Sequence, residues 1–229
     1  SNMFGVLEFS IQMVSSGIQP IIGIQVNIAE SSENEIDVGE VVLIAKNEIG
    51  YKNLLNITSK LDSNINYEKF VKWEKLEAHS DGLILLTGGI EKGFLGYPAS
   101  LGNIKLVNSR IKLLKGLFDD NLYVELQRHG LKDQIISEKN LILAADNFNL
   151  PLVATNDCFF ESPKKFNAHK VLTCIDKGLT NSSPNRRLLT QEHYLKDSCS
   201  MISLFKDIPE ALENTIVIAK RCSFFAKTH

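Results

Sequence analysis

The amino-acid sequence predicts an α/β fold in which strands and helices alternate along the chain. Short β-branched or apolar runs bounded by turn residues alternate with segments whose apolar residues recur every three or four positions. About five such strand–helix pairs are visible, and this alternation favours parallel strands covered by helices. The 229 residues, 44% of them hydrophobic, are enough to build a full core. An open doubly wound sheet and a barrel both fit this pattern.

The first part of the chain predicts a helix, two strands and a second helix. Over residues 3–16 the apolar residues share one helical face, and a glycine follows. Residues 20–28 form a β-branched run, residues 31–37 a polar loop and residues 41–45 a short apolar strand. The periodicity over 51–61 is again that of a helix.

The remaining elements are predicted in the same way. Apolar residues step by four, three and four positions between Val107 and Phe118, so residues 105–118 predict an amphipathic helix. The last helix is expected to begin at Asp207, because this residue can cap it while Glu210 completes a capping box. The other predicted elements are a helix around 71–76, a strand over 82–87, a Gly-rich connection over 90–104, a strand over 122–126, a helix over 131–145, a strand over 152–155, a helix over 163–176, a loop over 177–188 and helical structure over 197–223.

Composition and missing motifs argue against several classes of protein. A net charge of −2 and a pI near 6.2 lack the basic character of a stand-alone nucleic-acid binder. No apolar stretch approaches the roughly 20 residues that span a bilayer. The sequence has no phosphate-binding loop, nucleophile elbow or H-E-x-x-H motif, and its four cysteines show no C-x-x-C spacing. We therefore expect a cytoplasmic protein without a membrane partner.

The ends of the predicted strands carry the candidate functional groups. In parallel α/β folds such groups collect at the C-terminal ends of strands. This rule selects Gln25, Gly88, Gly89, Gln127, Arg128, His129, Asn156 and Asp157. Imidazole and carboxylate both bind Zn, Mn or Fe, so His129 and Asp157 can share a hydrolytic metal if further ligands join them. The alternative is structural, with a packed histidine and a helix-capping aspartate. His169, inside a predicted helix, is interpreted as a residue that packs the helix against the body.

Short segments along the whole chain carry a family resemblance. They are GIQV at 23–26, LIAKNEIGYKNL at 43–54, GLILLTGG at 82–89, ELQRHG at 125–130, PLVATND at 151–157, AHKVL at 168–172, DIPEALENT at 207–215 and IAKRC at 218–222. In this order they resemble the N-terminal polymerase-and-histidinol-phosphatase (PHP) domain of bacterial DNA polymerase III alpha subunits. The resemblance runs from about Met3 to Cys222.

This resemblance implies a fold and a larger context. The fold is a distorted (β/α)7 barrel over residues 3–190, N-terminally truncated here, followed by a helical segment over 191–229 that leads toward the polymerase palm. In the family the polymerase core belongs to the same chain, uses Mg and contacts DNA through the full-length enzyme. Because the palm carboxylates of the family lie beyond Cys222, the fragment itself is expected to be non-catalytic and to hold no cofactor.

The resemblance also implies a metal site that has lost most of its ligands. His129 and Asp157 match the intact family pattern. The substituted positions are Gln25 where many members have Glu, Glu40 where many have His, Gly89 where active members often have Cys or another polar ligand, and Phe159 in place of the His of an Asp-x-His pair. A His-x-His pair and an Asp of the family are expected before the start of this chain. A divalent ion needs several anionic or imidazole ligands, so the site is predicted to be degenerate.

Three functional hypotheses follow. In the first, the domain is structural, supports the polymerase core and docks the separate proofreading exonuclease subunit. In the second, it is an active metal-dependent 3′–5′ exonuclease or phosphoesterase that uses Zn or Mn with His129, Asp157 and Glu40. The third sets the resemblance aside and takes the chain as a stand-alone α/β metal-binding enzyme.

Overall fold

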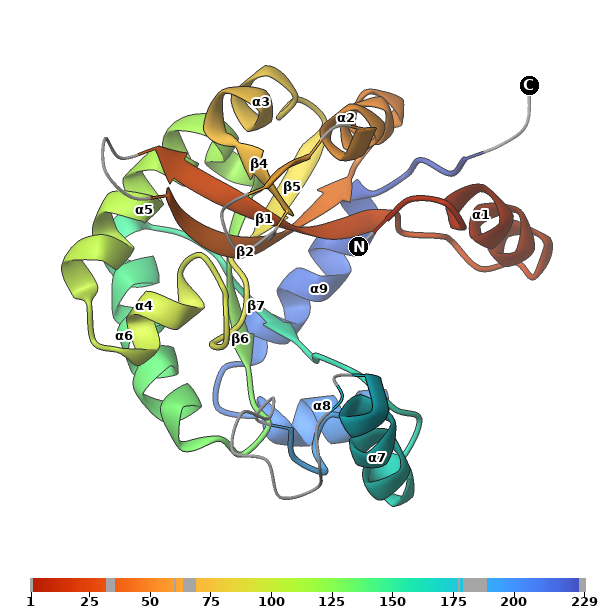
Figure 1. The fold of residues 1–229 in the computed structure, drawn as a ribbon, viewed down its shortest axis with the longest axis vertical. Coiled ribbons are helices and arrows are strands. Elements are labelled where there is room, and N and C mark those ends of the chain that lie inside the picture. The colour runs from red at the N-terminus through yellow and green to blue at the C-terminus, as the bar shows by residue number, and fades with distance from the viewer. Residues whose placement is uncertain are drawn as a thin grey trace.

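A computed structural model describes residues 2–31, 36–59, 61–63, 69–176, 178 and 189–226. Within these ranges strands and helices alternate, as the sequence predicts, and seven strands form one sheet in the order β3-β4-β1-β2-β5-β6-β7 (Figure 1). The strands are β1 (Gly23–Ser31), β2 (Ile36–Ala45), β3 (Asp62–Ser63), β4 (Lys69–Lys72), β5 (Leu83–Leu86), β6 (Leu122–Gln127) and β7 (Leu152–Thr155).

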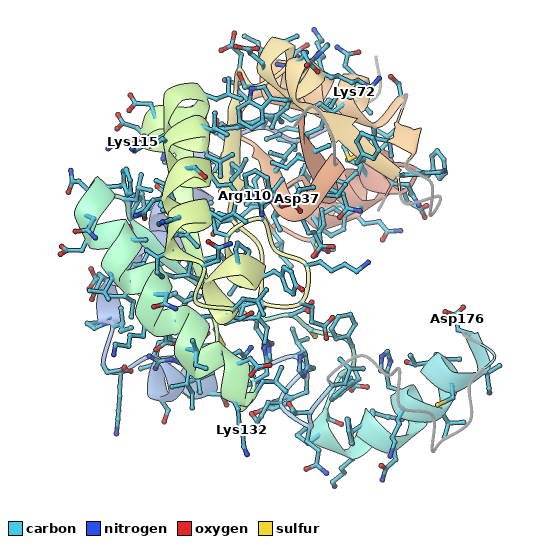
Figure 2. All side chains as sticks on the ribbon, turned by 60° about the vertical axis from the view of Figure 1, so that its left-hand side comes forward. Asp37, Lys72, Arg110, Lys115, Lys132 and Asp176 are labelled. Carbon is cyan, nitrogen blue, oxygen red and sulfur yellow. The ribbon has the colours of Figure 1, made fainter. Side chains whose placement is uncertain are left out.

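The described helices are α1 (Val6–Ser15), α2 (Glu48–Ser59), α3 (Trp73–Ala78), α4 (Gly96–Ser100), α5 (Ile104–Phe118), α6 (Lys132–Phe148), α7 (Phe166–Asp176), α8 (Ser198–Leu204) and α9 (Pro209–Arg221), with single 3₁₀ turns at 119–121 and 163–165. Helices α2, α5 and α6 pack on one face of the sheet, and α9 packs on the other. Figure 2 shows α7, which ends at Asp176, projecting from the rest of the molecule. None of the described helices is both long and apolar enough to cross a membrane.

Most predicted elements agree with the structure to within a few residues. The helix around 71–76 is wrong in its first part, since residues 69–72 form strand β4 and α3 starts only at Trp73. The polar loop expected over 31–37 is shorter, because β1 runs to Ser31 and β2 begins at Ile36. The Gly-rich connection contains the short helix α4. The loop predicted over 177–188 lies, apart from residue 178, outside the described residues.

The sheet is mixed, whereas the sequence predicted parallel pairing. β1 pairs antiparallel with β2 from Gly23 opposite Ile44 to Ser31 opposite Ile36, and β2 pairs antiparallel with β5. The pairs β1–β4, β5–β6 and β6–β7 are parallel, as expected. The physical reason lies in the chain between β1 and β2, which is too short for the crossover of a dozen or more residues that parallel neighbours require.

One face of the sheet carries the main apolar core. Alternate strand residues such as Ile24, Leu43 and Val124 lie in a buried cluster with Leu54 of α2 and Ile111 of α5. Successive side chains of a strand point to opposite faces, so this face packs on α2, α5 and α6 and forms the main core. Residues of the turn between α8 and α9 and of the last helix belong to the same cluster. The division between 3–190 and 191–229 stays a prediction.

The opposite face of β5, β6 and β7 is divided along the strands. Near the start of the strands, Ile84, Tyr123 and Val153 form a second cluster with Ile218 of α9. Toward the strand ends the same face carries polar residues, among them Glu125 two positions after Tyr123. Helix α9 therefore covers the apolar half of this face, and a cavity lies over the polar half.

Arg128, directly after β6, joins the C-terminal helices to the sheet. Its guanidinium donates to both carboxylate oxygens of Glu138 on α6 at 2.6 and 2.8 Å, and to both oxygens of Asp207 at the same two distances. It also donates to the Leu204 carbonyl oxygen at 2.6 Å and lies 4.6 Å from the centre of the Phe205 ring. These hydrogen bonds raise the pKa of Arg128 further above its usual range.

The predicted start of the last helix is therefore wrong. The N-cap residue of α9 is Ile208, and no side chain caps this helix, because the Asp207 carboxylate is engaged by Arg128. The helical structure expected over 197–223 is two helices separated by a turn. Helix α8 does have a side-chain cap, because the Asp197 carboxylate accepts the Ser200 backbone N–H at 2.7 Å.

The Arg128–Asp207 ion pair predicts how the stability of the fold changes at acid pH. Hydrogen bonds from Arg128 lower the pKa of Asp207 from 3.8 to about 2. A lowered carboxyl pKa stabilises the folded state above pH 3.8, and this contribution is lost as the pH falls toward 2. We expect Asp207→Asn to lower the free energy of unfolding at neutral pH by at most about 1 kcal/mol, since the pair is partly exposed. Urea unfolding across the acid range should show the difference from wild type shrinking as pH falls. Glu210→Gln, a change at an exposed carboxylate in the first turn of α9, is the control. A pH-independent difference for Asp207→Asn would contradict the prediction.

Candidate functional site

A cavity of about 610 Å³ lies on the polar half of the divided sheet face. Five of the predicted site residues line it, namely Gln25, Glu40, Gly89, His129 and Asp157. The last three follow the C-terminal ends of β5, β6 and β7, where the rule for parallel strands places them. Gln25 and Glu40 instead lie within β1 and β2, because these strands run antiparallel and reach the cavity along their length.

Phe159 and His169, which were also considered from the sequence, lie beside the cavity and not in its lining. The Phe159 ring is 5.9 Å from the ring of His193 and 5.7 Å from the ring of His169. His169, on α7, is also 5.6 Å from Phe160. The phenyl ring at position 159 thus separates two imidazoles, and it offers no lone pair to a metal.

The loop after β5 forms one wall of the cavity. It is attached to β2 through Glu40, whose backbone N–H donates to the Lys92 carbonyl at 2.7 Å and whose carbonyl accepts the Phe94 N–H at 2.8 Å. A Cβ on Gly88, which has a φ of +80°, would lie 2.2 Å from the Glu40 carbonyl oxygen. Only glycine fits this position. A Cβ on Gly89 would lie 2.3 Å from Oε1 of Gln127, so any ligand side chain at position 89 requires Gln127 to move.

An ion pair between a buried arginine and an exposed aspartate also supports this loop. Arg110 of α5, 2% exposed, donates to the Phe94 carbonyl at 2.8 Å and to Asp37 of β2 at 2.5 Å. Figure 2 shows Arg110 and Asp37 directed toward each other between the helix and the strand. The loop carrying Gly89 is thereby fixed to both α5 and β2.

Glu125 is the central polar residue of the site, and the sequence reasoning did not select it. Its carboxylate is buried and accepts hydrogen bonds from the Gly88 backbone N–H at 2.9 Å, from the Gln127 amide at 2.9 Å and from the Thr155 hydroxyl. Burial raises the pKa of Glu125, and the nearby Asp157 adds to the rise, while the three donors oppose it. A carboxylate inside an otherwise apolar strand was the signal available in the sequence.

His129 is buried and hydrogen-bonded at both ring nitrogens. Its Nδ1 lies 3.0 Å from the Gln134 amide nitrogen, and its Nε2 lies 3.1 Å from the Asn156 amide oxygen. Its ring stacks on that of His193 at 4.0 Å between centres, with 12° between the planes. Thr190 connects the two, since its hydroxyl donates to the His129 carbonyl at 2.7 Å and its backbone N–H donates to Nδ1 of His193 at 3.1 Å. His193 carries no local sequence signal for this role, because the contact joins distant parts of the chain.

Comparison with known proteins places the chain in a family. The model of the PHP domain matches residues 1–129, more than half of the chain. The chain belongs to the PHP domain family. Its mixed α/β sheet with surrounding helices agrees with the barrel-like fold predicted for such a domain.

This PHP domain is also similar to several curated DNA polymerase III alpha subunits. It is 39% identical to that of Caulobacter vibrioides over 98% of this chain and 20% of the relative. The identity is 38% to that of Rickettsia bellii, over 100% of this chain and 19% of the relative. It is 36% to that of Borreliella burgdorferi, over 99% of this chain and 20% of the relative. The chain thus spans about a fifth of the length of these relatives.

The donor groups of the cavity do not fit a metal centre of the kind found in hydrolases. Across the described ranges, no three His, Cys, Asp or Glu side chains are grouped so that they could hold a metal ion. Both nitrogens of His129 accept or donate hydrogen bonds, and the Glu125 carboxylate is surrounded by three donors. Gln25 and Gly89 add an amide and no side chain, which are poor partners for Zn or Mn.

The raised pKa of Glu125 predicts a pH-dependent stability. A carboxyl whose folded pKa lies above its ordinary value of 4.5 binds protons better in the folded state, so stability falls as pH rises from 4.5 through the folded pKa. Glu125→Gln removes this pH dependence of the free energy of unfolding. The variant also loses one hydrogen-bond acceptor that faces the three donors, so we expect its free energy of unfolding near pH 4.5 to be about 1–3 kcal/mol lower than that of wild type. Denaturant unfolding of both proteins from pH 4.5 to 8 should show the gap narrowing as pH rises. Parallel curves would contradict a raised pKa at Glu125.

Proposed function

We propose that this chain is the N-terminal PHP domain of a bacterial DNA polymerase III alpha subunit, and that the domain supports the polymerase without catalysing a reaction itself. The similarity to alpha subunits over 98–100% of the chain supports the first part. In this context polymerisation with Mg and most DNA contacts belong to the polymerase core of the same chain, and the protein works in the cytoplasm.

The state of His129 is the observation that carries the second part. His129 and Asp157 are the two predicted ligands that match an intact PHP site, and both line the cavity. Yet the ring of His129 is already bonded at Nδ1 and Nε2 to the amides of Gln134 and Asn156. A metal would have to break one of these buried hydrogen bonds, and it would find an amide at Gln25 in place of a carboxylate.

The decisive measurement is the metal content of the full-length polymerase. The protein is dialysed separately against Zn, Mn and Mg, and bound metal is counted per chain by elemental analysis. A palm-inactivated form is assayed in parallel for release of 3′ nucleotides from single-stranded DNA. We expect less than one tightly bound Zn or Mn per PHP domain and no 3′ cleavage, because too few ligands remain.

Asp157→Asn is the matched control for this experiment, since it changes one cavity carboxylate to an amide of the same shape. Metal content and cleavage should be the same in wild type and variant. One or more Zn or Mn per PHP domain, with 3′ cleavage that disappears in Asp157→Asn, would overturn the proposal and make the domain an active 3′–5′ exonuclease.

We further propose that the domain docks the separate proofreading exonuclease subunit. A domain without its own hydrolytic site leaves proofreading to another protein, and attachment to the polymerase places that protein near the growing 3′ end. Immobilised full-length polymerase should retain the purified exonuclease subunit of the same organism, and a polymerase lacking residues 1–229 should not. Equal retention by both, or retention by neither, would refute this docking role.

A further inference from the structure

His129 lies between two amide side chains, and backbone groups orient each amide. Oε1 of Gln134 accepts the backbone N–H groups of His129 at 2.7 Å and Leu131 at 3.3 Å, so its Nε2 is the atom that faces Nδ1 of the ring. The Nδ2 of Asn156 donates to the Tyr194 carbonyl at 2.7 Å, so its Oδ1 is the atom that faces Nε2. Neither amide can turn over without losing a bond to the main chain.

These two orientations determine where the imidazole proton lies. An amide nitrogen only donates, so Nδ1 of His129 has to accept, and an amide oxygen only accepts, so Nε2 has to carry the proton. The Lys196 ammonium, 3.4 Å from Oδ1 of Asn156, is compatible only with an oxygen at that position. The ring is 1% exposed, so water does not replace these partners.

We infer that Gln134 is a positioning residue that holds His129 as the neutral Nε2–H tautomer and thereby keeps the ring from binding a metal. A metal-bound histidine normally donates its second ring N–H to a carboxylate, a carbonyl or water, which leaves the opposite nitrogen free to ligate. Gln134 presents the reverse, a donor directed at Nδ1. The lone pair of the ring therefore points at an amide N–H, and the other nitrogen carries a proton directed at Asn156.

This inference rests on the proposed degenerate site for its functional meaning, but the tautomer can be measured without any metal or nuclease assay. The chain contains five histidines, so the ring nitrogens of the ¹⁵N-labelled 229-residue protein can be resolved by NMR. The signals that disappear in His129→Gln identify this ring. At neutral pH we expect a protonated Nε2 and an unprotonated Nδ1. A protonated Nδ1 in wild type would overturn the inference at once.

Two isosteric variants distinguish the effect of hydrogen-bond direction on the His129 ring from the effect of an added negative charge. Gln134→Glu and Asn156→Asp each replace an amide by a carboxylate and each add one negative charge beside the ring. Glu at 134 still accepts both backbone N–H groups, but it turns the donor at Nδ1 into an acceptor, so Nδ1 should gain a proton. Asp at 156 still accepts from Nε2, so Nδ1 should stay unprotonated.

Either of two results for the variants would refute the inference. Protonation of Nδ1 in both proteins would show that added charge, and not the direction of the Gln134 hydrogen bond, sets the state of the ring. An unprotonated Nδ1 in both would show that Gln134 does not control it. If Gln134→Glu does not fold, the wild-type spectrum and Asn156→Asp still decide the tautomer. Metal bound at the PHP site of the polymerase together with the expected tautomer would contradict the proposed function and the metal-blocking role, but it would leave the tautomer of His129 as assigned.

Discussion

The site depends on the burial of one carboxylate. Glu125 lies on the middle of three parallel strands, and a charged or polar group in that position is tolerated only when donors surround it. The donors come from the end of β5 at Gly88, from β6 itself at Gln127 and from β7 at Thr155. The three strand ends are thereby held at fixed separations. The glycine loop after β5, which closes the cavity, starts from this anchored point.

The segment E-L-Q-R-H shows how one strand end serves two purposes at once. Glu125 and Gln127 point to the polar face and build the floor of the cavity, as the alternation of a strand requires. Arg128 points away from the cavity and holds the turn between α8 and α9 through Asp207. Part of this segment is therefore required for packing whether or not a metal binds.

In the proposed degenerate site, side chains occupy the positions that metal ligation would need. The side chain of Gln127 occupies the space that a ligand at Gly89 would enter, and Gln134 and Asn156 occupy both nitrogens of His129. A ligand side chain introduced at one of these positions would first have to displace the side chains that make these contacts. Residues that share hydrogen-bond partners are generally coupled in energy, so we expect changes at these positions not to be additive.

The sequence by itself determined most strands and helices, because hydrophobic periodicity is a local property that a short window reveals. It also predicted part of the site: Gln25, Glu40, Gly89, His129 and Asp157 were selected by strand-end position or family resemblance, and all five line one cavity. Only the tertiary structure decided that β1 and β2 pair antiparallel, that Asp207 binds Arg128 and does not cap α9, and that His193 stacks on His129. Each of these depends on which distant group comes within hydrogen-bonding or stacking distance, and no local pattern of residue types encodes that distance.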